Sequence, residues 1–163
     1  FQRRGFSVLR FNFRGVGRSQ GRFDGGQGEL SDAASALDWM QTINPNASGC
    51  WIGGYSFGAW IGMQLLMRRP EIDGFIAVAP PAGALDFSFL APCPASGVIV
   101  HGGSDEVVPS DVAAKLARKL SSQKSVVVEY KEIPKADHLF SGHMEELTAA
   151  VEAYLDKALA PAG

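Results

Sequence analysis

Residues 50–69 have the sequence CWIGGYSFGAWIGMQLLMRR, and this stretch decides which fold we expect. Its first part, Cys50 to Tyr55, is a short apolar run of the kind that forms a buried strand. Its second part, Phe57 to Arg69, is apolar nearly all round, which is typical of a buried helix, and Pro70 ends it. The stretch therefore predicts a strand, a tight turn and a helix, with Ser56 in the turn.

Strand and helix signals alternate along the whole chain. The predicted strands cover Phe6–Phe13, Cys50–Tyr55, Gly74–Ala79, Gly97–Val100 and Ser125–Ile133, and the predicted helices begin at Leu30, Phe57, Ser110 and His143. The uniformly apolar strands suit the centre of a parallel sheet, which is covered on both faces. The pattern predicts an α/β fold, a mostly parallel sheet with flanking helices, in a single domain over residues 1–163.

The composition excludes several classes of protein. Of the 163 residues, 46% are hydrophobic and 20% are charged, as in ordinary globular proteins. The formal net charge of −2 shows no basic excess, so we expect no nucleic-acid partner and no membrane partner. No run approaches the roughly 20 apolar residues that span a bilayer. The two cysteines, Cys50 and Cys93, lack metal-site spacing and are expected to be buried thiols, which favours a cytoplasmic location.

Three polar side chains with the chemistry of acyl transfer follow predicted strands. Ser56 lies in Gly54-Tyr55-Ser56-Phe57-Gly58, at the turn between strand and helix, while Asp105 and His138 each follow a later strand. A serine hydroxyl needs a base to remove its proton, and that base needs a carboxylate to orient it. Because parallel strands bring their carboxyl ends to one edge of a sheet, we expect these three side chains to meet there.

With these residues in place, the chain resembles an α/β-hydrolase from its fourth strand to its last helix. It is similar in particular to small bacterial hydrolases of the dienelactone-hydrolase-like type. The motifs that carry the resemblance are Arg14-Gly15-Val16-Gly17-Arg18-Ser19, the turn at Ser56, and His101-Gly102-Gly103-Ser104-Asp105 through Pro109. The resemblance implies an α/β-hydrolase fold that lacks its first three strands.

The resemblance also implies an activity, that of a serine hydrolase on carboxylic esters or related small-molecule acyl substrates. It implies Ser56 as nucleophile, His138 as general base and Asp105 as the acid that orients the base, with an acyl-enzyme intermediate. The Phe57 N–H is then expected to donate to the oxyanion, and no cofactor or metal is implied. A neutral imidazole is required, so activity should rise with pH through roughly 6 to 7.5. The expected substrate contacts are Tyr55 and Phe140.

The chain departs from the family pattern before Phe6. The family has three further strands and a helix there, and the loop after the third strand supplies the second oxyanion donor. That third strand lies between the fourth and the fifth, so we expect a slot between Phe6–Phe13 and Cys50–Tyr55. The slot either closes or is filled by a second copy of the chain, which would make a homo-oligomer. The alternative function is a catalytically silent domain, either inactive or dependent on a partner chain to complete the oxyanion hole.

Other residues around the predicted site have alternative interpretations. Glu106 is a second candidate acid if the loop is shifted by one residue, whereas Asp137 is expected to be a turn residue. His101 is expected to be a structural, hydrogen-bonded histidine. The glycines of Gly15-Val16-Gly17 do not continue as a dinucleotide-binding motif, because no helix starts there. No pair of candidate ligands has helix or hairpin spacing, so the sequence does not favour a metal site.

Overall fold

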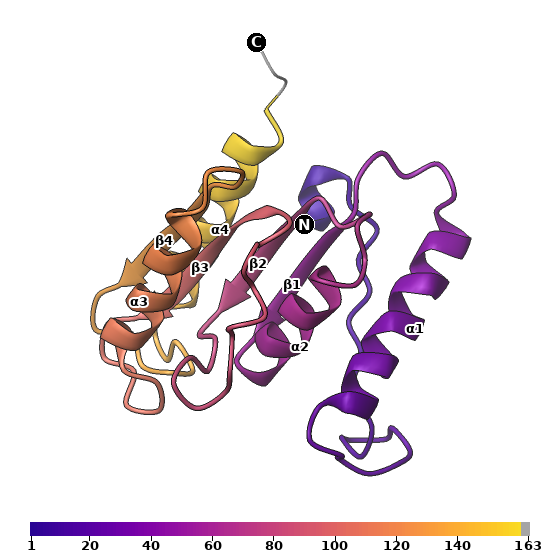
Figure 1. The fold of residues 1–163 in the computed structure, drawn as a ribbon, viewed down its shortest axis with the longest axis horizontal. Coiled ribbons are helices and arrows are strands. Elements are labelled where there is room, and N and C mark those ends of the chain that lie inside the picture. Colours follow the sequence, from indigo (N-terminus) through magenta and orange to yellow (C-terminus); the bar gives the residue numbers. More distant parts are fainter. Residues whose placement is uncertain (161–163) are drawn as a thin grey trace. The chain divides into compact units, whose positions relative to one another are not determined.

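The computed structural model describes residues 1–160, which divide into two compact units (Figure 1). The first unit covers residues 1–50, and the second begins at Trp51. The proposal that residues 1–163 form a single α/β-hydrolase domain stays a prediction, and its last three residues lie outside the described part.

The second unit is built on a parallel sheet with helices on both of its faces (Figure 1). Within the described residues, its strands lie side by side in the order β1 (Trp51–Tyr55), β2 (Gly74–Val78), β3 (Ser96–Gly102) and β4 (Val128–Ile133). Its helices are α2 (Phe57–Leu66), α3 (Ser110–Ser121) and α4 (Met144–Ala158). α2 and α3 cover one face and α4 covers the other. The predicted α/β architecture with a parallel sheet is therefore confirmed.

The core lies around the two central strands. β2 and β3 are buried along nearly their whole length, because helices cover both faces, and this explains their uninterrupted apolar sequences. β1 and β4 form the edges of the sheet in the described part of the chain and are partly exposed. β1 is the edge at which the predicted second copy would add a strand, and that partner stays a prediction.

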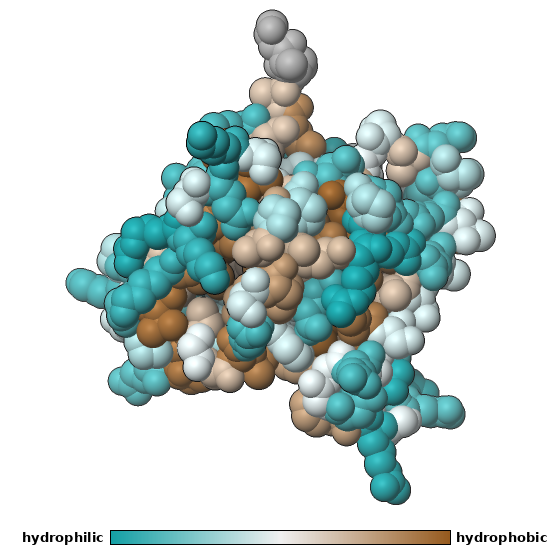
Figure 2. All heavy atoms as spheres, viewed as in Figure 1, coloured by the Kyte–Doolittle hydropathy of each residue, from teal (hydrophilic) through white to brown (hydrophobic). Residues whose placement is uncertain are grey.

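The helices differ in how much of their surface the sheet covers. α3 buries Ala113, Leu116, Ala117 and Leu120 and turns its basic residues outward. Figure 2 shows this outer side of α3 as hydrophilic. α2 is apolar nearly all round and mostly buried, but it has only 10 residues. None of the helices in residues 1–160 is both long and apolar enough to cross a membrane.

The first unit contains the 3-10 turn η1 (Gln2–Arg4) and helix α1 (Gln27–Ile43), with no strand between them. The predicted strand over Phe6–Phe13 is wrong, because these residues carry no regular secondary structure. A strand is defined by its ladder of hydrogen bonds, and residues 1–50 provide no second strand with which Phe6–Phe13 pairs.

Charged side chains order the glycine-rich loop that precedes α1. The Arg14 guanidinium forms a two-pronged ion pair with Asp32, with Nη2 2.8 Å and Nε 3.1 Å from its carboxylate oxygens. The fully buried Glu29 carboxylate accepts the Gly26 N–H at 2.8 Å and the Asp24 N–H at 3.2 Å. These bonds start α1 at Gln27, three residues before the predicted Leu30.

A matched pair of valines tests the packing of the central strands. Val98 in β3 has no exposed surface, whereas Val127 is 64% exposed. Val98→Ala removes two methyl groups from a closely packed interior and should lower the free energy of unfolding by about 2 kcal/mol. Val127→Ala should change it by less than about 0.5 kcal/mol. Denaturant unfolding measures both variants, and equal effects would contradict the packing described for β3.

Candidate active site

Ser56 occupies a strained turn between β1 and α2. Its backbone has φ 49° and ψ −120°, a conformation that residues other than glycine rarely adopt. The turn is held in place because the Ser56 N–H donates to the Val78 carbonyl at 2.8 Å, and the Ser56 carbonyl accepts the Ala59 N–H at 2.9 Å. The strand, turn and helix predicted around Ser56 are thus confirmed.

Gly54 permits this turn because it has no side chain. A Cβ at Gly54 would lie 2.6 Å from the Cα of Ala59 and would overlap the Gly58 carbonyl. The first turn of α2 therefore packs directly against the backbone of β1. The first glycine of the Gly-x-Ser-x-Gly motif is required by this close approach of two backbones.

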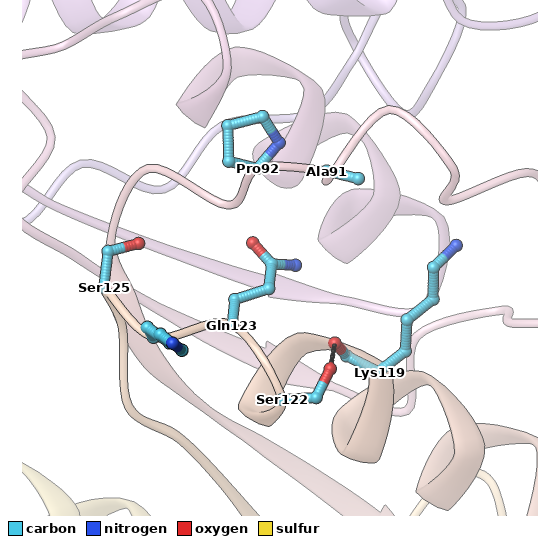
Figure 3. Close-up of a pocket in the computed structure, with 7 residues that line it drawn as sticks. Ala91, Pro92, Lys119, Ser122, Gln123 and Ser125 are labelled. Atoms are coloured by element: carbon cyan, nitrogen blue, oxygen red, sulfur yellow. Dashed lines mark hydrogen bonds between the residues drawn. The ribbon is translucent and has the colours of Figure 1, made fainter.

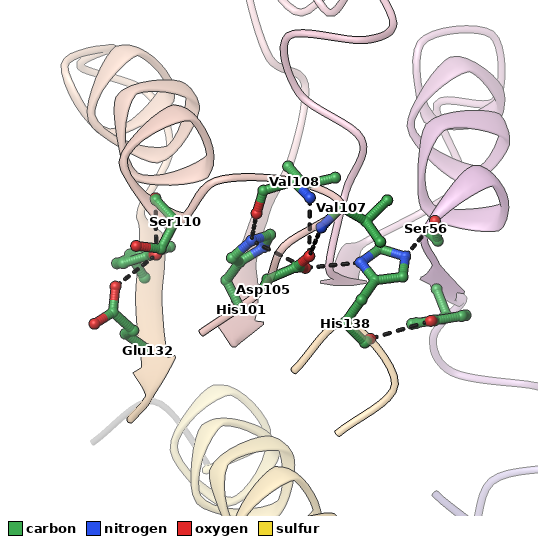
Figure 4. A network of polar contacts seen from close by, with 10 residues as sticks. Ser56, His101, Asp105, Val107, Val108, Ser110, Glu132 and His138 are labelled. Carbon is green, nitrogen blue, oxygen red and sulfur yellow. Dashed lines mark hydrogen bonds and ion pairs between the residues drawn. The ribbon is translucent and has the colours of Figure 1, made fainter. Parts of the chain in front are cut away.

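Asp105 follows β3, and both of its carboxylate oxygens accept hydrogen bonds from groups of the protein. Its Oδ1 accepts the N–H groups of Val107 and Val108, each at 2.8 Å, and its Oδ2 lies 2.7 Å from His138 Nδ1 (Figure 4). The side chain has no exposed surface. Burial alone would raise the pKa of Asp105, but the hydrogen bonds from Val108, His138 and Val107 together lower it below its usual value. Asp105 is therefore a carboxylate at neutral pH.

His138 lies in the loop after β4, which is pressed against the end of β3. The Gly103 N–H donates to the Ile133 carbonyl and the Ser104 N–H to the Ala136 carbonyl, both at 2.9 Å. A Cβ at Gly102 would overlap the same Ala136 carbonyl, so glycine is needed there too. This packing fixes the loop from which the imidazole reaches Asp105.

The His138 imidazole joins Asp105 to Ser56. Its Nε2 lies 3.1 Å from the Ser56 Oγ, and its Nδ1 faces the Asp105 carboxylate (Figure 4). A carboxylate only accepts hydrogen bonds, so we assign the proton of the neutral ring to Nδ1. Nε2 then presents a lone pair to the Ser56 hydroxyl, which is the arrangement that a general base requires.

The remaining predicted site residues have different positions. Phe57 is the first residue of α2, directly after Ser56. Tyr55 is 43% exposed and its hydroxyl lies 3.1 Å from the His138 carbonyl. Phe140 requires a correction: it was expected to contact substrate, but its ring is only 1% exposed and packs inside the unit. Its left-handed backbone, with φ 55°, turns the loop inward at this point.

The secondary candidates are also placed. The Asp137 Oδ1 accepts the Ser141 N–H at 2.8 Å, so Asp137 stabilises a turn as expected. His101 is fully buried and its Nε2 donates to the Val108 carbonyl at 2.8 Å, which is the structural hydrogen bond expected of it. The same Nε2 lies 3.4 Å from Asp105 Oδ2, so His101 is close to Asp105, as the order of the strands predicted. Within residues 1–160, no group of three His, Cys, Asp or Glu side chains is arranged to hold a metal ion.

A surface hollow of about 460 Å³ lies away from these residues, beside the end of α3 (Figure 3). It is lined by Ala91, Pro92, Lys119, Ser122, Gln123, Lys124 and Ser125. The Gln123 side chain accepts the Cys93 N–H at 2.6 Å and donates to the Leu90 carbonyl at 2.9 Å. The amide thus fastens the proline-rich loop to the segment that directly follows α3, and we interpret this hollow as structural.

Comparisons with known proteins show the family of this chain. Residues 1–95 match the protein family described as serine aminopeptidase, S33. An uncharacterised protein of Rickettsia prowazekii is 53% identical over 155 residues, which cover 93% of this chain and 65% of that protein. An uncharacterised protein of Mycobacterium tuberculosis is 28% identical over 148 residues, which cover 76% of this chain and 51% of that protein. The chain thus spans less than two thirds of the length of these curated relatives.

Solved structures give the same result. A protein of unknown function from Agrobacterium tumefaciens, provisionally assigned as an α/β hydrolase, is 57% identical with a TM-score of 0.95, covering 98% of this chain and 73% of that one. An α/β serine hydrolase from Xanthomonas campestris, described as without a lid, is 30% identical with a TM-score of 0.82, covering 94% and 67%. An α/β serine hydrolase homologue from Coxiella burnetii is 34% identical with a TM-score of 0.75, covering 90% and 67%.

The close approach of two backbones at Gly54 predicts that alanine destabilises the protein more at Gly54 than at Gly62. Gly54→Ala forces a Cβ into the backbone of α2 and should destabilise the protein by about 3 kcal/mol, at the upper end of overpacking costs. Gly62→Ala is the control, because its Cβ would meet only the Ile52 side chain, at 3.3 Å. Thermal or denaturant unfolding compares the two. A Gly54→Ala protein as stable as the control would contradict the described contact between β1 and α2.

The lowered pKa of Asp105 predicts how stability depends on pH. The pKa of Asp105 is lower in the folded chain than in the unfolded chain, where it is about 3.9. The ionised carboxylate therefore stabilises the folded chain at a pH above about 3.9, and this stabilisation is lost as the pH falls through the pKa of the folded chain. The stability difference between the wild-type protein and Asp105→Asn should therefore narrow as the pH falls from about 5 to about 3. Urea unfolding at each pH measures this difference, and a constant difference would show that Asp105 is not the buried acceptor described above.

Proposed function

Because the chain belongs to the α/β-hydrolase superfamily, in the family described as serine aminopeptidase S33, we propose that it is a serine hydrolase of carboxylic esters or related acyl substrates. The observation that carries this proposal is the continuous line of hydrogen bonds from Asp105 through His138 to Ser56. Each member of that line is a residue type that the reaction requires.

In the proposed reaction, Ser56 attacks the carbonyl carbon of the substrate. His138 Nε2 takes the proton of the hydroxyl as the bond between Oγ and carbon forms, and the π electrons of the carbonyl move to its oxygen. Asp105 stabilises the imidazolium that results. When the tetrahedral intermediate collapses, Nε2 returns the proton to the leaving group. Water then attacks the acyl-enzyme by the same sequence of proton transfers and releases the acid.

We assign the backbone N–H of Phe57 to the developing oxyanion. Phe57 opens α2, and the start of a helix carries a partial positive charge that favours an anion. A donor held rigidly at that place stabilises charge that is present in the transition state and not in the substrate, and losing one such donor costs about 2.7–4 kcal/mol in a well-studied protease. The conformation of Ser56 supports this assignment, since it places the following residue at the beginning of the helix.

The surroundings of Ser56 favour a small substrate with an apolar group. Two exposed apolar residues lie close to the proposed catalytic residues in the chain: Val107, two residues after Asp105, and Leu139, directly after His138, each 69% exposed. The relative from Xanthomonas campestris is described as having no lid, which supports an open site here as well. The cytoplasmic location and the homo-oligomer stay predictions from the sequence.

Reaction with a fluorophosphonate probe tests the proposal. We expect one adduct on the wild-type protein by intact mass, because the probe reacts with an activated serine, and no adduct on Ser56→Ala. Ser104→Ala is the control and should react like the wild type, since only the backbone N–H of Ser104 is used in the described contacts. A panel of short-chain esters then measures hydrolysis. A wild-type protein without an adduct would contradict the proposal and favour the catalytically silent domain.

A further inference from the structure

Tyr55 connects the strand that carries the serine to the loop that carries the histidine. It is the last residue of β1, and Ser56 follows it directly. Its hydroxyl lies 3.1 Å from the backbone carbonyl of His138, and because a carbonyl only accepts, the hydroxyl donates. The two rings also lie close together, with centroids 5.4 Å apart and planes tilted by 46°. Tyr55 therefore contacts both the main chain and the ring of His138.

The loop of His138 is held from the other side by β3. The hydrogen bonds from Gly103 and Ser104 attach its first part to the segment that carries Asp105. These bonds fix the distance between His138 and Asp105, but they do not set the distance between His138 and Ser56. The bond from Tyr55 does reach across to β1, the strand that positions Ser56. Two independent anchors thus hold the imidazole between the groups it must connect.

The hydroxyl of Tyr55 remains a donor over a wide range of pH. The pKa of the Tyr55 hydroxyl is raised; burial is the largest cause, and the negative charges of Asp105 and Asp137 add to it. The bond to His138 therefore persists through the neutral and mildly alkaline range in which the proposed base is active. This role also changes the interpretation of Tyr55 from the sequence, where it was expected to contact substrate.

We propose that Tyr55 is a positioning residue: the bond from its hydroxyl to the His138 carbonyl keeps the His138 imidazole within hydrogen-bond distance of Ser56. The proposal rests on the proposed hydrolase function, because it concerns the same site. Transfer of a proton between Ser56 and His138 depends steeply on their separation, and small misplacements of a catalytic group greatly reduce the rate. Tyr55 touches neither the reacting atoms nor the proton, so it acts through His138.

The experiment compares Tyr55→Phe with Tyr130→Phe. Both changes remove one hydroxyl that bonds a backbone carbonyl, but the Tyr130 hydroxyl lies 3.3 Å from the Ser110 carbonyl, away from the triad. We expect Tyr55→Phe to lower kcat and the rate of fluorophosphonate labelling about three- to tenfold, the effect of one hydrogen bond, with KM unchanged. Tyr130→Phe should keep the wild-type values. Melting temperatures of the two variants show whether a loss of rate reflects general destabilisation.

Hydrogen exchange of residues 134–142 tests the positioning without any use of activity. This loop should exchange faster in Tyr55→Phe than in Tyr130→Phe, because one of its anchors is lost. Equal exchange and unchanged rates would overturn the proposal, and a loss confined to KM would overturn it in favour of a substrate contact. If the wild-type protein takes up no probe while the loop still exchanges faster in Tyr55→Phe, the proposed function fails and the anchoring by Tyr55 is supported.

Discussion

The buried carboxylate of Asp105 holds the site together. Moving an ionised group out of water is costly unless its lone pairs are fully used, and here two backbone amides of its own loop and one imidazole use them. The same three bonds set the path of the loop after β3 and the orientation of His138. Any change that leaves this carboxylate short of donors therefore disturbs the fold and the chemistry together.

The turn at Ser56 is the second rigid point of the site, and the packing of the strand and helix on either side offsets its backbone strain. A non-glycine residue at φ 49° costs of order 1–3 kcal/mol and persists only where the surroundings determine it. β1 is fixed by β2 through the strand ladder, and α2 is fixed by its mostly buried surface. The missing side chain at Gly54 lets the two meet. Precise placement of one hydroxyl is thus obtained from ordinary packing of a strand and a helix.

Much of this arrangement could be predicted from the sequence, because it depends on local patterns and on chain order. Apolar runs predicted β1, β2 and β3, and the parallel order of the strands predicted that Ser56, Asp105 and His138 lie together at the carboxyl ends of the strands. The errors concern features that depend on distant neighbours. Phe6–Phe13 has the composition of a strand but no ladder to join, and Phe140 lies in a loop but turns inward. The bond from Tyr55 to a carbonyl 83 residues away has no sequence signal.

The separation of the three residues along the chain has a consequence for folding. Ser56 and His138 lie 82 residues apart, with β2, β3 and β4 between them in the chain, so their hydrogen bond closes a long loop. Such non-local contacts form slowly, and β4 must be in place before His138 can reach its partners. A partly folded chain can have the turn at Ser56 and the central strands in place while Ser56 still lacks the contact with His138. The reactivity proposed for Ser56 therefore requires that β4 has joined the sheet, and it would report this late step of folding.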